Sequence, residues 1–139
     1  MLIKNKFIKS ISDISNEEFK SISNARNSPF MSYKFLESME ASGSASPSAG
    51  WHPHHVTSYK NQTLNGFMPL YLKNNSQGEF VFDHQWSYAL QRAQRTYYPK
   101  FLSAIPFTPC ETSKLIAPEL SVASEMIKTT KDKMAELNI

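Results

Sequence analysis

Two carboxylates, Glu79 and Asp83, are the residues of this chain best suited to acid–base chemistry. They lie in the segment GEFVFD at 78–83, which alternates like a short β-strand and would place both carboxylates on one strand face. A carboxylate can take a proton from an attacking amine, so both are candidate catalytic residues. Asp83 has a second, favoured interpretation, in which its carboxylate accepts the unpaired amide protons of a helix that begins there. The two roles of Asp83 do not exclude each other, and Glu79 would otherwise be a solvated strand position.

Aromatic and polar side chains that follow this pair are candidate substrate contacts. Tyrosine and tryptophan combine an apolar ring with a polar tip, and they often line sites that stack a sugar or hold a peptide. The candidates for substrate binding are Trp86, Tyr97, Tyr98, Lys100, Phe107 and Thr108. The alternative is that the aromatic rings of this group fill the core. Arg92 and Arg95 would face solvent or, alternatively, capture a carboxylate or a phosphate.

Histidines and the single cysteine suggest two further kinds of chemistry, and neither is favoured. His52, His54 and His55 are close in sequence, and His52 and His54 would share a strand face and could ligate zinc, but no cysteine or acid with ligand spacing lies near them. Packing and hydrogen bonding are the favoured roles, and no metal site is expected. Cys110 would act as a nucleophile only as a thiolate beside a base, and the candidate neighbour in space is His84.

A strand–helix–strand unit would bring the candidate residues together. After a strand at 79–83, apolar residues recur at helical spacing, and Pro99 ends the helix near Tyr97. The apolar stripe expected to pack against the sheet consists of Trp86, Leu90, Ala93 and Tyr97. Residues 100–107 are typical of a second strand, parallel to the first, which predicts a right-handed βαβ crossover. Ligands of such sheets bind at the carboxyl ends of the strands, here residues 83–84 and 107–110.

The rest of the chain supplies the other layers of an α/β fold. The expected elements are a strand at 7–11, a helix from Asn16, a helix from Ser28 or Ser32 to Gly43, a strand at 51–60, a strand at 64–73 and a long helix after Pro118. Ser15 and Glu18 form a capping box for the first helix, and short turns predict antiparallel middle strands. The strand at 64–73 should carry a bulge at Gly66 or Pro69. The face that the last helix should bury comprises Leu120, Ala123, Ile127, Met134 and Leu137.

Composition limits the class of protein and its partners. The 139 residues suffice for one domain with a packed core, since 40% are hydrophobic and 19% are charged. A net charge of +3 on scattered basic residues forms no stripe, so a nucleic-acid partner is not indicated. One cysteine permits no disulfide within the chain and fits a reducing, cytoplasmic setting. We find neither a signal-peptide core nor an apolar run near the roughly 18 residues of a membrane helix.

Short runs of residues in a fixed order resemble one protein family. They are SPFMSY at 28–33 with FL at 35–36, Glu40 with SGS at 42–44, GWHP at 50–53, GFMPLYLK at 66–73, GEFVFD at 78–83, YYPK at 97–100 and PFTP at 106–109. Together they resemble the Fem-like family of predicted N-acyltransferases, described as peptidoglycan biosynthesis or recognition proteins, within the GNAT superfamily. The resemblance implies a GNAT-like α/β fold, with a mixed central sheet and helices on both faces.

The resemblance also implies an activity and its partners. The reaction would be transfer of an acyl or aminoacyl group to an amine on a small molecule or a peptide. The donor for a full-length member would be acyl-CoA or aminoacyl-tRNA, and the latter is the one route to a nucleic-acid partner. The chain would be a partial N-terminal GNAT-like domain spanning 1–139 without its last strands, and a remaining C-terminal GNAT-like domain would be its partner.

One departure from the GNAT pattern weakens the case for a cofactor on this chain. The loop that holds the CoA pyrophosphate in typical GNAT enzymes is rich in glycine and opens a helix. Here residues 83–86 read DHQW, with no glycine and with a carboxylate where phosphate would sit. We therefore expect this chain to bind no CoA by itself. The alternative function is a non-catalytic, GNAT-shaped module that recognises a cell-wall precursor or a peptide.

Overall fold

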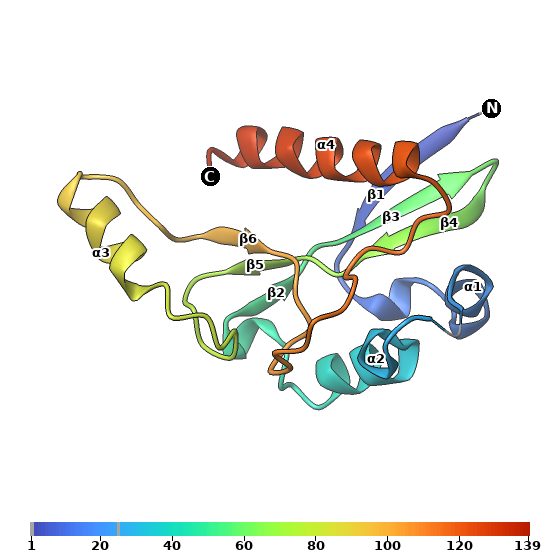
Figure 1. Ribbon diagram of the computed structural model, residues 1–139, viewed down its shortest axis with the longest axis horizontal. Helices are drawn as coiled ribbons and strands as arrows, with labels where there is room; N and C mark the ends of the chain where they lie inside the picture. The colour runs from blue at the N-terminus through green and yellow to red at the C-terminus, as the bar shows by residue number, and fades with distance from the viewer. Residues whose placement is uncertain (1, 25) are drawn as a thin grey trace.

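The computed structural model describes residues 2–24 and 26–139 and shows a mixed α/β fold with two three-stranded antiparallel sheets (Figure 1). In order across the first sheet, the strands are β1 (Ile3–Ile8), β3 (His55–Lys60) and β4 (Thr63–Met68). In the second sheet they are β2 (Trp51–Pro53), β5 (Tyr71–Lys73) and β6 (Lys100–Leu102). An α/β fold is therefore confirmed at the level of class.

One long hairpin runs through both sheets, as the sequence predicts for the middle of the chain. Its first arm is β2 followed by β3, and its second arm is β4 followed by β5. The sheets separate near Pro69, which has no amide proton for a ladder, and the His54 amide still donates to the Leu70 carbonyl at 2.8 Å. A register shift in β4 leaves Asn65 as the extra residue of a bulge, one position before the predicted Gly66.

Helices cover both sides of the first sheet. The helices α1 (Asn16–Ile22) and α2 (Tyr33–Ala41) lie on one side and α4 (Leu120–Leu137) lies on the other (Figure 1). Neighbouring residues of β4 pack on opposite sides of the sheet. The Phe67 ring lies 5.1 Å from the Phe19 ring of α1, and Met68 packs with Met126 of α4. Three short 3-10 helices, η1 (Ile11–Asp13), η2 (Pro29–Met31) and η3 (Pro47–Ala49), connect these layers.

The predicted face of α4 is wrong, although the helix itself is confirmed. Val122, Met126 and Thr130 are buried, whereas Leu120 is 86% exposed and Ile127 is 45% exposed. Both sets follow helical spacing, so periodicity alone could not choose between them. The contact with the first sheet decides which set is buried.

The predicted parallel βαβ unit is also wrong. Residues 79–83 form no strand, because the backbone turns through positive φ at Gly78 and Phe80. The predicted strand at 100–107 shortens to β6, which pairs antiparallel with β5 so that Lys73 lies opposite Lys100. The chain therefore leaves β5 and returns to the same sheet edge through one long loop at 74–99.

The helix of that loop, α3 (His84–Arg92), ends five residues before the predicted Tyr97. None of its residues is buried, and Trp86 is 69% exposed, so the predicted stripe does not pack against a sheet. In Figure 1 the helix lies at one end of the molecule, away from α1 and α2. Of the described helices, none combines the length and the apolar content needed to cross a membrane.

Candidate functional site

Two lysines meet where the long loop begins and ends. Lys73 of β5 and Lys100 of β6 are cross-strand partners, so their side chains lie on the same face of the sheet. Like charges in directly opposite positions destabilise a strand pair. Here Glu79 and Asp83 of the loop lie close enough to compensate them. Lys100 Nζ is 2.8 Å from Glu79 Oε2 and 2.6 Å from Asp83 Oδ2, and Lys73 Nζ is 3.7 Å from Glu79 Oε1.

Hydrogen bonds converge on the Asp83 carboxylate. Its Oδ2 accepts from Lys100 Nζ, from the Tyr97 hydroxyl at 2.7 Å and from the Ser76 hydroxyl at 3.0 Å, and the Tyr98 hydroxyl lies 2.6 Å from Ser76 Oγ. Burial acts to raise the pKa of Asp83, but the bonds from Lys100, Tyr97 and Ser76 outweigh it and hold that pKa well below its usual range. Asp83 is therefore ionised near neutral pH and is a poor proton acceptor.

The favoured interpretation of Asp83 as a side-chain helix cap is wrong. Asp83 occupies the N-cap position of α3, and its backbone carbonyl accepts from Ser87, but its carboxylate makes no capping bond. The carboxylate turns to Lys100 instead, because a buried charge is stabilised more by an opposite charge than by a backbone amide at an exposed helix end.

We call the charged side chains Lys73, Glu79, Asp83 and Lys100, together with the hydroxyls of Ser76, Tyr97 and Tyr98, the ion cluster. Lys73 is its most enclosed charge. Its side chain is fully buried, its Nζ donates to the Gln77 carbonyl at 2.9 Å, and the Trp51 ring lies 3.6 Å from Nζ. Burial lowers the pKa of Lys73 to about 8, and the Glu79 carboxylate opposes that shift only in part. Burial acts in the same direction on Lys100, but its bonds to Asp83 and Glu79 raise the pKa of Lys100 well above the usual range.

Two buried carboxylate oxygens of the cluster are open. Glu79 Oε1 and Asp83 Oδ1 accept no hydrogen bond from any residue in 2–24 or 26–139. Buried acceptors in proteins nearly always have a partner, and an ionised carboxylate can accept several bonds. Glu79 Oε1 is left with its ion pair to Lys73 Nζ at 3.7 Å, and Asp83 Oδ1 has no hydrogen-bond partner among the described residues.

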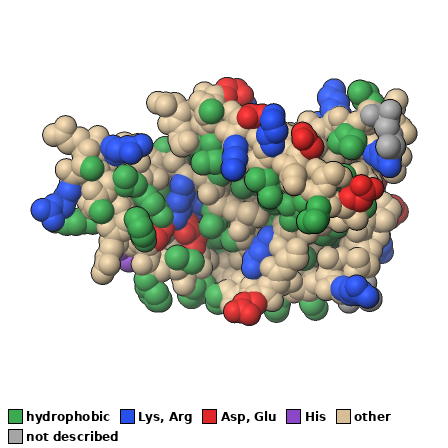
Figure 2. Space-filling model, turned by 45° about the horizontal axis from the view of Figure 1, so that its top comes forward, with side chains coloured by type: hydrophobic (Ala, Val, Ile, Leu, Met, Phe, Trp, Pro, Cys, Tyr) green, Lys and Arg blue, Asp and Glu red, His purple; other side chains and the backbone are tan. Residues whose placement is uncertain are grey.

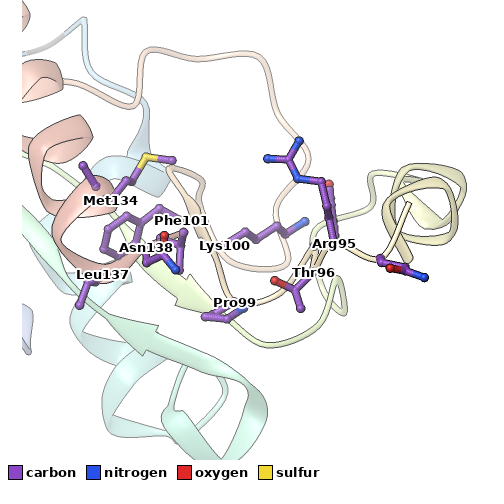
Figure 3. A pocket seen from close by; sticks show the side chains of 12 residues that line it. Arg95, Thr96, Pro99, Lys100, Phe101, Met134, Leu137 and Asn138 are labelled. Atoms are coloured by element: carbon purple, nitrogen blue, oxygen red, sulfur yellow. The ribbon is translucent and has the colours of Figure 1, made fainter. Parts of the chain in front are cut away.

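A cleft of about 690 Å³ adjoins the cluster, between residues 94–101 and the last turn of α4 (Figure 3). Lys100 and Tyr97 belong to both the cluster and the cleft wall. Arg95 and Thr96 lie on one side of the cleft, and the apolar side chains Met134 and Leu137 lie across from them (Figure 3). The volume is within the range of sites for small molecules and peptide segments.

Arg95 is the available cation of this cleft. It forms no ion pair with any described side chain, whereas Lys100 is committed to two carboxylates. A guanidinium binds a carboxylate or a phosphate through two parallel hydrogen bonds. The cleft thus combines an anion-binding group with an apolar wall, which suits a ligand that has an apolar body and a negative end.

The structure brings together most of the candidates named from the sequence. Glu79, Asp83, Tyr97, Tyr98 and Lys100 converge in the cluster.

The other three candidate contacts lie elsewhere. Trp86 is exposed on α3, Phe107 packs 5.6 Å from the Trp51 ring, and Thr108 donates to the Pro106 carbonyl. Sequence reasoning missed Lys73 and Ser76. The position of Lys73 opposite Lys100 is a signal that appears only once the strand register is known.

The three neighbouring histidines form hydrogen bonds within the fold, with His52 Nε2 3.2 Å from Asn74 Nδ2 and His54 Nε2 2.6 Å from Lys9 Nζ. His55 is buried, with Nε2 2.6 Å from Glu40 Oε1, while its Nδ1 accepts from the Leu70 amide at 3.2 Å. Burial acts to raise the pKa of Glu40, but the bonds from His55 and Ser10 outweigh it and lower that pKa. Within the described residues, no three His, Cys, Asp or Glu side chains are grouped so that they could hold a metal ion. Cys110 packs partly buried against the core beside α1.

Comparisons with known proteins identify the family. No curated protein and no solved structure matched the chain. A family model named FemAB_like, described as peptidoglycan biosynthesis/recognition, matches residues 10–139. The match covers nearly all of the chain and confirms the resemblance drawn from the short runs. The chain belongs to the FemAB-like family of peptidoglycan biosynthesis/recognition proteins.

Proposed function

We propose that this chain supplies the acceptor-binding part of an N-acyltransferase that transfers an acyl or aminoacyl group to an amine. The observation that carries the proposal is the cleft, in which the unpaired Arg95 lies beside a network of buried charges and faces an apolar wall. The acceptor would be a peptide whose carboxylate binds Arg95 and whose apolar side chains contact Met134 and Leu137. The family description supports a cell-wall peptide as the natural example.

The cluster would contribute in two ways. Its ion pairs fix Lys100 and Tyr97 in the cleft wall, so that the bound peptide meets a rigid surface. Of the two carboxylates, Glu79 rather than Asp83 is the proposed proton acceptor, because three hydrogen bonds to Asp83 Oδ2 hold the pKa of Asp83 well below its usual range, whereas Glu79 accepts a hydrogen bond from Lys100 alone among the described residues. The amine nitrogen would attack the acyl carbonyl, the bond to the donor's leaving group would break, and the amine proton would pass to Glu79.

The GNAT-like arrangement and the donor are part of the same proposal. The donor would be acyl-CoA or aminoacyl-tRNA, bound outside this chain, since residues 83–86 contain no glycine-rich phosphate loop. A remaining GNAT-like domain would supply that donor site.

Titration with a short peptide tests acceptor binding. Calorimetry should show that a tripeptide with a free carboxyl terminus binds, and that the same peptide with an amidated terminus binds about 10- to 100-fold more weakly, as expected for hydrogen bonds to a charged group. Arg95→Gln should cause a similar loss, whereas the matched control Arg92→Gln on α3 should not. Equal affinity for both peptides, or an unchanged affinity of Arg95→Gln, would contradict the proposal.

A non-catalytic binding module is the second candidate function. It is favoured by the ion pairs themselves, because both carboxylates of the cluster bind Lys100 and neither is free in the cleft. Product formation with an acyl donor and a peptide that binds Arg95 separates the two. Turnover that Glu79→Gln abolishes, with peptide affinity retained, supports the enzyme, and binding without turnover in the presence of the proposed donor-binding domain supports the module.

A further inference from the structure

In the segment 79–83 the charged side chains are buried and the apolar side chains are exposed. The carboxylates of Glu79 and Asp83 point inward, whereas the three apolar residues between them point outward. Phe80, Val81 and Phe82 are 60%, 58% and 88% exposed. Consecutive exposed apolar residues are atypical of a soluble surface unless the surface binds something.

The exposed apolar surface continues onto α3. Trp86 and Leu90 lie one turn apart on one side of the helix, and neither is buried. His84, Tyr88 and Arg92, also spaced by four, form the other side, which is polar apart from the 65% exposed Tyr88 ring. We call Phe80, Val81, Phe82, Trp86 and Leu90 together the apolar edge. Figure 2 shows hydrophobic side chains gathered at the α3 end of the molecule, with Lys and Arg side chains beside them.

The charges around the apolar edge have one sign. Between residues 78 and 110 the only acids are Glu79 and Asp83, and both are buried against Lys100. The charges that remain on the outside of this segment are those of Arg92 and Arg95. An apolar surface whose own segment exposes only cations is complementary to a surface that is apolar within and anionic at its rim.

We propose that the apolar edge binds an anionic lipid surface. Phe80, Phe82 and Trp86 enter the boundary between headgroups and acyl chains, and α3 lies in the plane of that boundary. Arg92, on the polar side of α3, extends its long side chain back along the helix to headgroup phosphate. This site is distinct from the cleft at β6 and α4, and the proposal does not depend on the proposed transferase function.

A second copy of the chain fits this edge less well. The apolar edge consists of one side of a nine-residue helix and a three-residue loop, whereas a stable interface takes roughly 800 Å² per partner. Pairing two such edges would also bring the arginines of both copies together. A nucleic acid matches the cations but leaves Val81 and Phe82 without an apolar partner.

The two tryptophans of the chain provide a direct readout. Trp51 is fully buried and Trp86 is 69% exposed, so a change in emission on adding vesicles reports Trp86. We expect a blue shift with vesicles of phosphatidylglycerol and phosphatidylcholine, a much weaker shift with phosphatidylcholine alone, and quenching by brominated acyl chains. Loss of the shift in Trp86→Phe, with vesicle co-sedimentation retained, assigns the signal.

Variants separate this edge from other exposed apolar residues. Phe82→Ser should lower vesicle partitioning about tenfold or more, and Arg92→Gln should lower it about fivefold on anionic vesicles only. The matched control is Leu120→Ser, because Leu120 is equally exposed but begins α4. Circular dichroism confirms that each variant is folded, and Phe80→Ser replaces Phe82→Ser if the latter is not.

Several results would overturn the proposal. The first is a Trp86 emission that does not change at millimolar anionic lipid, and the second is an equal loss of vesicle partitioning in Leu120→Ser and Phe82→Ser. The third is a blue shift that grows with protein concentration in the absence of lipid, which would indicate self-association. The fourth is binding to an RNA oligonucleotide but not to vesicles.

Discussion

Replacing Lys100 by methionine should destabilise the chain more than any surface substitution. Lys100 Nζ donates to Asp83 Oδ2 at 2.6 Å, to Glu79 Oε2 at 2.8 Å and to Ser76 Oγ at 3.1 Å. The variant removes the cation that both buried carboxylates share, and Lys73, beside Glu79, is the lysine of the ion cluster that remains. Removing one partner of a buried ion pair costs about 3–5 kcal/mol, and because the Lys100 side chain is 17% exposed we expect about 3 kcal/mol. The thermal midpoint should fall by roughly 6–12 °C.

The effect should depend on pH with a defined sign. Burial opposes ionisation of Asp83, but the bonds from Lys100, Tyr97 and Ser76 hold its pKa well below the usual range. The stability from this shift is present above the ordinary carboxyl pKa of about 4 and is lost as the pH falls toward the folded-state pKa. The difference in unfolding free energy between wild type and Lys100→Met should therefore narrow below about pH 4.

Urea unfolding followed by circular dichroism at pH 7 and pH 3.5 measures both effects. Adding Asp83→Asn to Lys100→Met removes one uncompensated charge. The stability lost in the double variant should therefore be smaller, by about 1 kcal/mol or more, than the sum of the losses in the two single variants. The control is Lys128→Met, which removes an exposed pair with Asp132 and should leave the midpoint unchanged. A loss of less than about 0.5 kcal/mol in Lys100→Met would refute the reasoning. So would a double variant whose loss equals the sum of the two single losses, or a difference between wild type and Lys100→Met that does not change with pH.

Three further predictions concern the same loop and its surroundings. Burial lowers the pKa of Lys73 to about 8, so the unfolded state binds more protons than the folded state between about pH 8 and 10.5. As the pH rises through that window, urea unfolding should show that wild type gains stability relative to Lys73→Met. Gly78 has φ +76° and an added Cβ would lie 2.5 Å from the Phe107 ring, so Gly78→Ala should cost at least about 1–2 kcal/mol in thermal melts. Leu90→Ala on the uncovered α3 should change stability by less than about 0.5 kcal/mol in urea, whereas Met126→Ala in the core should cost about 2–5 kcal/mol.

Elements set by near neighbours could be predicted from the sequence. Ser15 and Glu18 bond each other's backbone amides at 3.1 and 2.8 Å, as their spacing predicts, and α1 begins at Asn16. The long hairpin followed from two apolar runs around a short turn. The capping box joins residues three apart, and the pairing of the hairpin starts at the short turn between Lys60 and Thr63.

The segment from 79 to 107 could not be predicted in the same way, because its conformation depends on distant partners. Alternation of Phe80 and Phe82 with acids predicts a strand only if the phenylalanines face the core. Instead Lys73 and Lys100 draw the carboxylates inward and leave the rings outside. The stripe of α3 likewise indicates an apolar face but not what covers it.

The candidate site divides along the same line. The sequence named Glu79 and Asp83 as candidate proton acceptors, with a helix cap as the favoured role of Asp83, and it named Lys100 as a candidate substrate contact. Whether a carboxylate accepts protons depends on its neighbours in space, and here Lys100 keeps Asp83 ionised. That neighbour was predicted on a parallel strand, and only the antiparallel register places it opposite Lys73.

The ion cluster also explains how the short strands β5 and β6 pair although the long loop 74–99 separates them along the chain. The pairing of β5 with β6 spans three residues on each strand, and one of the three cross-strand pairs sets two lysines against each other. Long loops are entropically costly to close, and like charges in opposite positions weaken a ladder. Glu79 and Asp83 reverse the sign of that local interaction, because each binds Lys100 directly. The position of β6, and with it the cleft wall that holds Arg95, therefore depends on two carboxylates of the loop rather than on the ladder alone.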